Sequence, residues 1–74
     1  MNVKKKGVRH NLYMFRHGLG LNQQEIADRI GCSRATYSAI ELGKQNGRVK
    51  FWEDLQKAFG LTDAEKGELM KKEG

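Results

Sequence analysis

Two sets of helix-start and helix-stop signals follow one another closely in the middle of this 74-residue chain. Asn22 can accept a hydrogen bond from the backbone of Glu25, whose side chain can reach back, so the two residues form a capping box. Gly31 can adopt the left-handed conformation that ends this helix, and Ser33 can cap a further helix, which Gly43 ends. The spacing therefore predicts two short helices, joined by a tight turn, that must cross steeply.

Three further helices are predicted, one before this pair and two after it. Proline is absent, so glycine is the residue that interrupts helices. Apolar residues at helical spacing predict a first helix, ending near Gly18 or Gly20, and a fourth helix, starting at Val49 and ending at Gly60. Their stripes are Val8, Leu12, Phe15 and Leu19, and Trp52, Leu55 and Phe59. A second capping box, Thr62 with Glu65, opens a fifth helix that extends through Met70.

These helices define an all-α fold class, because no period-two run of β-branched residues predicts a strand. The helix at 23–30 and the helix at 34–42 can cross closely where the first carries a small residue, Ala27. Apolar residues of both helices then face one core: Ile26, Ile30, Tyr37 and Ile40. We therefore expect a compact five-helix domain, in which Tyr37 and Trp52 are core residues rather than stacking platforms.

Composition narrows the functions open to the chain. A formal net charge of +5 and 31% charged residues favour a soluble domain with an anionic partner. Cys32 is the only cysteine, which excludes an intrachain disulfide and a cysteine-rich zinc site, so we expect no metal and no cofactor. No long uncharged run predicts a membrane span, and a core this small leaves little room for a catalytic cleft, which argues against an enzyme.

The first residues of the chain are basic. Lys4, Lys5 and Lys6 are followed by polar residues, without the apolar stretch that a secretion signal needs. We expect residues 1–7 to form a flexible basic arm, and residues 8–74 to form the folded domain, with its paired helices at 23–42. The lysine run favours a solvated terminus over a phosphate-binding arm.

The outward face of the helix at 34–42 consists of small polar residues and one arginine, a composition that fits a groove of DNA. Its residues are Ser33, Arg34, Ala35, Thr36 and Ser38. The planar fork of Arg34 can bind O6 and N7 of a guanine. Ala35 and Thr36 can meet a thymine methyl group, and Ser33 or Ser38 can reach a phosphate or a base edge.

Contacts with the DNA backbone are expected from the segments that flank this helix. Gln23 lies at a helix N-terminus, where its amide can bind a phosphate beside the positive end of the helix dipole. Lys44, Asn46 and Arg48 in the following loop supply the other predicted phosphate contacts.

Residues 21–44, LNQQEIADRIGCSRATYSAIELGK, resemble the phage repressor and Cro-type helix-turn-helix family, also called the xenobiotic-response-element-like family. The resemblance rests on the glutamine after the cap, Ala27, Gly31 and the run Glu41-Leu42-Gly43-Lys44, and it extends more weakly over 16–61. It departs from the family where a proline usually follows the loop asparagine, and at Ala39, where relatives often carry a longer polar side chain.

The resemblance implies a lambda-repressor-like five-helix DNA-binding domain. Family members place the helix that corresponds to 33–42 in the major groove, and they use the positions of Gln23 and the 44–48 loop for the flanking phosphates. The family also forms an ion pair at the positions of Arg16 and Glu41, which links the first and third helices.

We therefore interpret the chain as a sequence-specific regulator of transcription that binds double-stranded operator DNA and is of the repressor type. We expect it to be bacterial or phage-encoded, to act in the cytoplasm, and to bind as a weak or DNA-induced homodimer through its C-terminal helices. The alternative interpretation is a protein-interaction module, such as an antitoxin-like or anti-repressor partner, in which the same small face or the Trp52 helix docks another protein.

Overall fold

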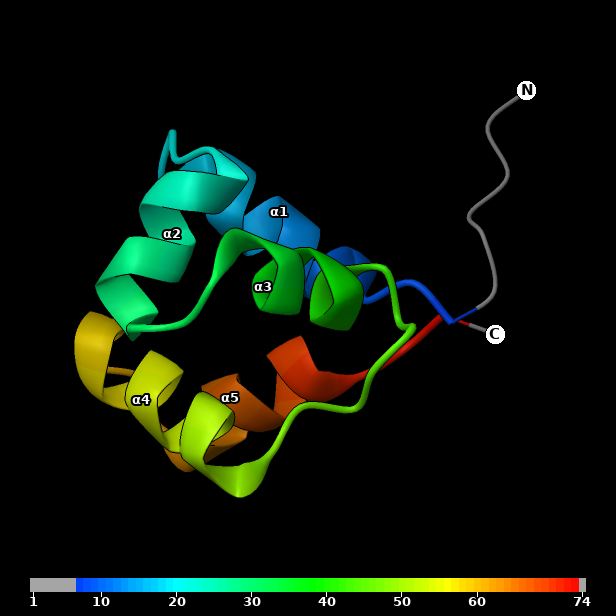
Figure 1. Cartoon of the computed structure of the whole chain (residues 1–74). Helices are drawn as coiled ribbons and strands as arrows, with labels where there is room; N and C mark the ends of the chain where they lie inside the picture. The colour runs from blue at the N-terminus through cyan, green and yellow to red at the C-terminus, as the bar shows by residue number, and fades with distance from the viewer. Residues whose placement is uncertain (1–6, 74) are drawn as a thin grey trace.

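The computed structural model describes residues 7–73, which contain five helices and no strand (Figure 1). The helices are α1 (His10–Gly18), α2 (Gln23–Ile30), α3 (Arg34–Glu41), α4 (Val49–Phe59) and α5 (Asp63–Met70). The predicted all-α fold class is confirmed. The lysine run Lys4 to Lys6 of the predicted arm lies outside the described residues.

Both predicted capping boxes are present. The Asn22 side chain accepts from the backbone N–H of Glu25 at 2.8 Å, and the Glu25 carboxylate accepts from the backbone N–H of Asn22 at 2.9 Å. Thr62 and Glu65 exchange the equivalent hydrogen bonds at the start of α5. Ser33 caps α3 by accepting from the backbone of Thr36. Local sequence signals therefore place the starts of α2, α3 and α5.

The first helix ends at Gly18, as predicted, but both outer residues of its predicted apolar stripe lie outside the helix. Val8 precedes α1, and Leu19 follows it with 47% of its surface exposed, so neither belongs to the buried stripe. The reason lies outside the helix: the backbone N–H of Arg9 donates to the carbonyl of Glu41 at 2.9 Å, and the carbonyl of Val8 accepts from Glu73 at 2.8 Å. These long-range bonds engage the backbone of Val8 and Arg9, so the helix begins only at His10.

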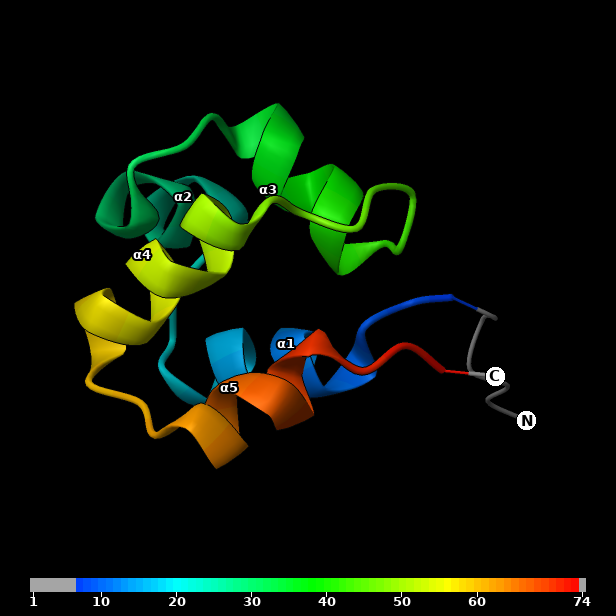
Figure 2. The ribbon, with the colours of Figure 1, turned by 90° about the horizontal axis from the view of Figure 1, so that it is seen from below.

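The helices surround a single apolar core, with α3 along one edge of the molecule and α1 and α5 on the opposite side (Figure 2). The largest side chains with essentially no exposed surface are Leu12, Ile26, Tyr37, Ile40 and Leu55. Ala27, Ile30 and Trp52 are also buried, which confirms the predicted core of the two crossing helices and of α4. Cys32 is only partly buried at the edge of this core.

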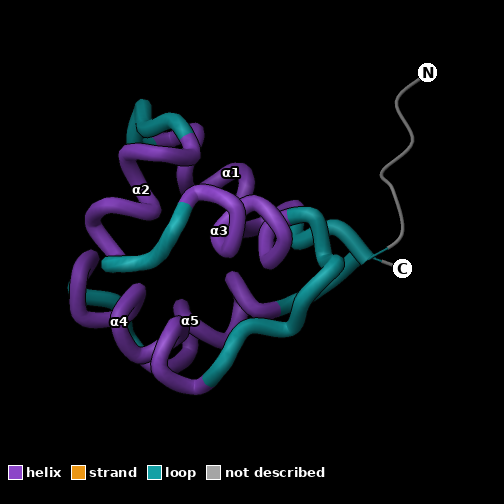
Figure 3. The backbone as a smooth tube through the Cα atoms, viewed as in Figure 1, coloured by secondary structure: helices purple, strands orange, loops and turns teal. Residues whose placement is uncertain are grey.

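The loop between α3 and α4 lies beside both terminal segments of the described chain (Figure 3). The backbone N–H of Gly7 donates to the carbonyl of Glu73 at 2.8 Å, so residues before α1 and after α5 are joined. Gly43, just after α3, has a positive φ of 79° and packs against the backbone of Gly7. A side chain at Gly43 would collide with that backbone.

We predict that Gly43→Ala destabilises the domain more than Gly60→Ala does. Both glycines have positive φ, which costs a non-glycine residue about 1–2 kcal/mol, but a Cβ at Gly60 meets no atom within 4 Å. Gly43→Ala should lose roughly a further 1–3 kcal/mol, because the backbone of Gly7 must shift. Urea denaturation of both variants, followed by circular dichroism, measures the difference. Equal losses would contradict the close packing of Gly43.

Candidate nucleic-acid interface

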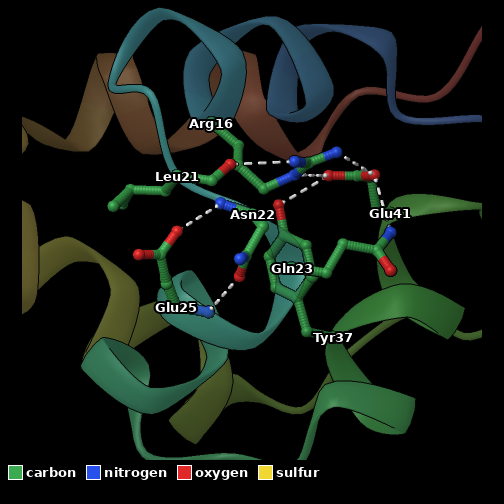
Figure 4. Close-up of polar contacts among 7 residues, drawn as sticks. All are labelled: Arg16, Leu21, Asn22, Gln23, Glu25, Tyr37 and Glu41. Atoms are coloured by element: carbon green, nitrogen blue, oxygen red, sulfur yellow. Dashed lines mark hydrogen bonds and ion pairs between the residues drawn. The ribbon is translucent and has the colours of Figure 1, made fainter.

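A buried ion pair joins α1 to the C-terminal end of α3. Arg16 Nε donates to Glu41 Oε1 at 2.9 Å and Arg16 Nη2 donates to Glu41 Oε2 at 3.2 Å, so the contact is bidentate (Figure 4). The two side chains are only 10% and 4% exposed. Two parallel hydrogen bonds fix an angle as well as a distance, which lets the pair set how α3 lies on α1.

Three further hydrogen bonds complete this network. The Tyr37 hydroxyl donates to Glu41 Oε1 at 2.7 Å, and Gln23 Nε2 donates to Glu41 Oε2 at 3.1 Å. Arg16 Nη1 donates to the carbonyl of Leu21 at 2.9 Å, in the segment that precedes α2. The network therefore links α1, the start of α2 and both turns of α3 through one carboxylate.

The network keeps its charges at neutral pH. Burial alone would raise the pKa of Glu41, but hydrogen bonds from Arg16, Tyr37 and Gln23 outweigh burial, and the pKa lies below its usual value. The hydrogen bond to Glu41 raises the pKa of Arg16. Burial, and then the hydrogen bond to Glu41, raises the pKa of Tyr37, so its hydroxyl remains a donor.

The face of α3 that points away from this network carries the residues predicted to bind bases. Arg34, Ala35 and Thr36 are exposed, and Ser38 is half-buried. The Ser33 hydroxyl is engaged in the helix cap, where it accepts from the Thr36 backbone at 3.1 Å and donates to Thr36 Oγ1 at 2.9 Å. Arg34 is therefore the one long side chain on the exposed first turn of α3.

Two hollows flank the first turn of α3. One, of about 490 Å³, is lined by Arg16, Asn22, Gln23, Gln24 and Arg34, so it brings together the predicted base-binding arginine and the predicted phosphate-binding glutamine. The other, of about 560 Å³, lies between α2, α3 and the start of α4 and includes Thr36, Asn46 and Arg48. Lys44 is exposed and lines neither of these two hollows.

Two predicted phosphate ligands have partners within the domain. Gln23 donates from its amide nitrogen to Glu41, which leaves its amide oxygen and its second N–H available to another group. Asn46 Oδ1 accepts from Lys72 Nζ at 2.7 Å, so the asparagine side chain is turned toward the C-terminal segment. Arg34 and Arg48 are exposed.

Sequence reasoning missed Arg9. Arg9 is 3% exposed, and its guanidinium donates to backbone carbonyls of α3, the following loop and α5. One signal could have found it: Arg9, Leu12 and Arg16 are spaced by three and four residues, which puts Arg9 in register with two inward-facing side chains. Charge alone gave no reason to place it inside.

Residues 7–73 contain neither a grouped set of metal ligands nor a helix fit to span a membrane. In that part of the chain no three His, Cys, Asp or Glu side chains are grouped as metal ligands would be. No helix there combines the length and the hydropathy that crossing a membrane requires.

The fold and the exposed α3 face define a helix-turn-helix domain, and the family model described as "Helix-turn-helix domain" matches residues 9–69. The chain belongs to this family. It is also 42% identical over 45 residues to the cryptic phage CTXphi transcriptional repressor RstR of Vibrio cholerae. That match covers 61% of this chain and 40% of the relative, so the chain spans less than half of the relative's length. No solved structure matches this chain.

We predict that Arg16→Met strongly destabilises the domain and that adding Glu41→Leu restores part of the loss. Removing one partner leaves a buried charge without compensation, which costs roughly 3–5 kcal/mol, whereas an apolar pair leaves no such charge. Recovery should be partial, because Tyr37 and Gln23 lose their acceptor. Urea denaturation of both single variants and the double variant measures the coupling. Small, additive losses would show that the pair does not hold α3.

Proposed function

We propose that this chain is a double-stranded DNA-binding regulator of transcription, of the repressor type, that inserts α3 into the major groove. One observation carries the proposal: a buried charge network holds α3 from behind, while its first turn presents Arg34 and small residues to solvent. An eight-residue helix with a narrow outer face can enter a groove about 12 Å wide. Membership of the helix-turn-helix family supports the same function.

In this proposal the α3 face reads bases and the flanking segments bind phosphates. Arg34 binds a guanine edge, Ala35 and Thr36 contact thymine methyl groups, and Ser33 and Ser38 approach the adjacent backbone or base edges. Phosphate contacts come from Gln23 on one side of α3 and from the loop on the other. The loop residues are Lys44, Asn46 and Arg48.

Repression is proposed on the similarity to the phage repressor, together with the binding mode. A domain that occupies the major groove of an operator excludes other proteins from it, and no catalytic group is required. We extend the proposal to action in the cytoplasm of a bacterium or from a phage genome. The formal net charge of +5 supports attraction to a polyanion.

We also propose a weak or DNA-induced homodimer. One short helix contacts only a few base pairs, and related binding modes gain affinity by placing two helices about 34–36 Å apart on a two-fold site. Val49 and Met70 support an interface on the C-terminal helices, because these apolar side chains are 74% and 40% exposed and line one hollow between α4 and α5.

We expect the chain to bind random duplex DNA, with an affinity that falls as salt rises. Lys44→Ala should weaken binding to every duplex and lower the slope of log affinity against log salt by about one unit, because one phosphate contact is lost. Lys57→Ala, which removes an exposed lysine near the end of α4, is the matched control and should leave the slope unchanged. Fluorescence anisotropy across a salt series measures both. Absence of duplex binding together with tight binding to a protein would favour the interaction-module alternative.

We expect Arg34→Ala to lose roughly 1–3 kcal/mol of binding free energy on a selected site and to relax the preference at one base pair. The reason is that Arg34 is the long side chain of the exposed first turn. Selection from a random duplex pool, before and after the substitution, gives both the site and the change. Arg29→Ala, at an exposed arginine of α2, is the control. Equal loss on all sequences would make Arg34 a phosphate ligand, and selected sites without two-fold symmetry would contradict the dimer.

A further inference from the structure

The Arg9 side chain ties together three segments that are far apart in the sequence. Its Nη1 donates to the carbonyl of Ile40 at 2.6 Å and to that of Gln45 at 2.9 Å. Its Nη2 donates to the carbonyl of Asn46 at 3.1 Å, and its Nε donates to the carbonyl of Met70 at 3.0 Å. Four backbone carbonyls therefore converge on one guanidinium.

The identity of these carbonyls explains why a cation lies here. Ile40 is in the last turn of α3 and Met70 is the last residue of α5, where helix carbonyls lack intrahelical partners and carry the negative end of the helix dipole. The carbonyls of Gln45 and Asn46 belong to the loop between α3 and α4. One guanidinium thus donates hydrogen bonds to the ends of two helices and to the loop.

The loop is also fixed from its other side by Trp52 of α4. The indole Nε1 donates to the carbonyl of Asn46 at 3.1 Å, the same oxygen that accepts from Arg9. The Arg9 guanidinium carbon lies 5.3 Å from the centre of the Trp52 ring, within range of a cation–π contact. Gly47 packs so closely on Trp52 that a Cβ there would meet the indole nitrogen. Arg9 and Trp52 together define the path of residues 45–47.

The geometry points to Arg9 as the positioning residue of the phosphate-binding loop, an inference that rests on the proposed DNA-binding function. Arg9 is 3% exposed, so it does not itself reach a phosphate. Its four acceptors include Gln45 and Asn46, which lie between the predicted phosphate ligands Lys44 and Arg48. Arg9 fixes the backbone from which those two side chains extend to the DNA.

Arginine is required for this role because the four acceptors are spread around the guanidinium plane. A lysine ammonium presents its donors from a single point and cannot reach all four oxygens at once. Arg9→Lys therefore keeps the charge of the protein and removes the geometry. The substitution separates loop position from electrostatic attraction.

We test the inference with Arg9→Lys, measured at a temperature at which circular dichroism shows a folded domain. The affinity for random duplex DNA should fall about 5- to 10-fold, because a displaced loop no longer brings Lys44 and Arg48 to the phosphates. The salt slope should fall by about one to two units, since contacts of Lys44 and Arg48 are lost. Phe59→Leu, which loosens the aromatic contact with Phe15 far from the loop, is the control and should leave both quantities unchanged.

Amide hydrogen exchange reads the loop without DNA. The amides of Lys44 and Gln45 donate to the carbonyl of Ala39 at 2.8 and 3.2 Å, and Arg9→Lys should accelerate their exchange selectively, at least 10-fold more than that of Ile30 in α2. Phe59→Leu should change the exchange rates of Lys44, Gln45 and Ile30 by a similar factor. In the unaltered protein, the Arg9 side-chain protons and these two loop amides should exchange through the same opening. The opening rates, obtained after correction for the intrinsic exchange rate of each group, should therefore agree across temperature.

Unchanged DNA affinity in a folded Arg9→Lys protein, or equal acceleration of all amides, would overturn the role of Arg9. Unequal opening rates for Arg9 and the loop in the unaltered protein would also overturn it, and this measurement needs no variant that folds. Absence of duplex binding by the unaltered protein would refute the proposed function instead, and selective loop exchange in Arg9→Lys would still support the control of the loop by Arg9.

Discussion

The carboxylate of Glu41 is the interaction on which the arrangement of the domain depends. A buried charge is costly unless it is paired and hydrogen-bonded, and this one accepts four hydrogen bonds, two from Arg16 and one each from Tyr37 and Gln23. Because the donors belong to α1, α3 and the start of α2, satisfying the carboxylate fixes how these helices lie. The orientation of the exposed α3 face therefore follows from the chemistry of the buried one.

Two inward-facing arginines divide the positioning of the interface between them. Arg16 fixes α3 through a carboxylate, and Arg9 fixes the loop after α3 through backbone carbonyls. Both tasks use the planar, many-donor geometry of guanidinium rather than its charge alone. The loop at 43–48 contains no helix or strand, so its shape depends on contacts with Arg9, Trp52 and the backbone of Gly7.

The parts of the fold that local chemistry decides could be predicted from the sequence. Asn22 with Glu25, and Thr62 with Glu65, mark helix starts because each box is closed within four residues. The start of α1 could not be predicted in this way, because bonds from Arg9 to Glu41 and from Glu73 to Val8 decide it. The candidate site residues on α3 could be predicted because they share one face of one helix. The contacts of Arg9 that fix the loop could not, because their acceptors lie in three separate segments.

The same distinction bears on what the positive charge of the chain can do. Of the 14 Lys and Arg residues, Arg16 is neutralised by a buried carboxylate and Arg9 is enclosed by carbonyl oxygens, so neither presents its charge to a ligand at the surface. In the proposed binding mode, direct contact with a polyanion therefore falls to exposed residues such as Arg34, Lys44 and Arg48. In this view the exposed arginines and lysines contribute the attraction to DNA, and the buried arginines hold the α3 face and the loop in position. A count of basic residues estimates the attraction, but only their burial shows which of them shape the surface that a duplex would meet.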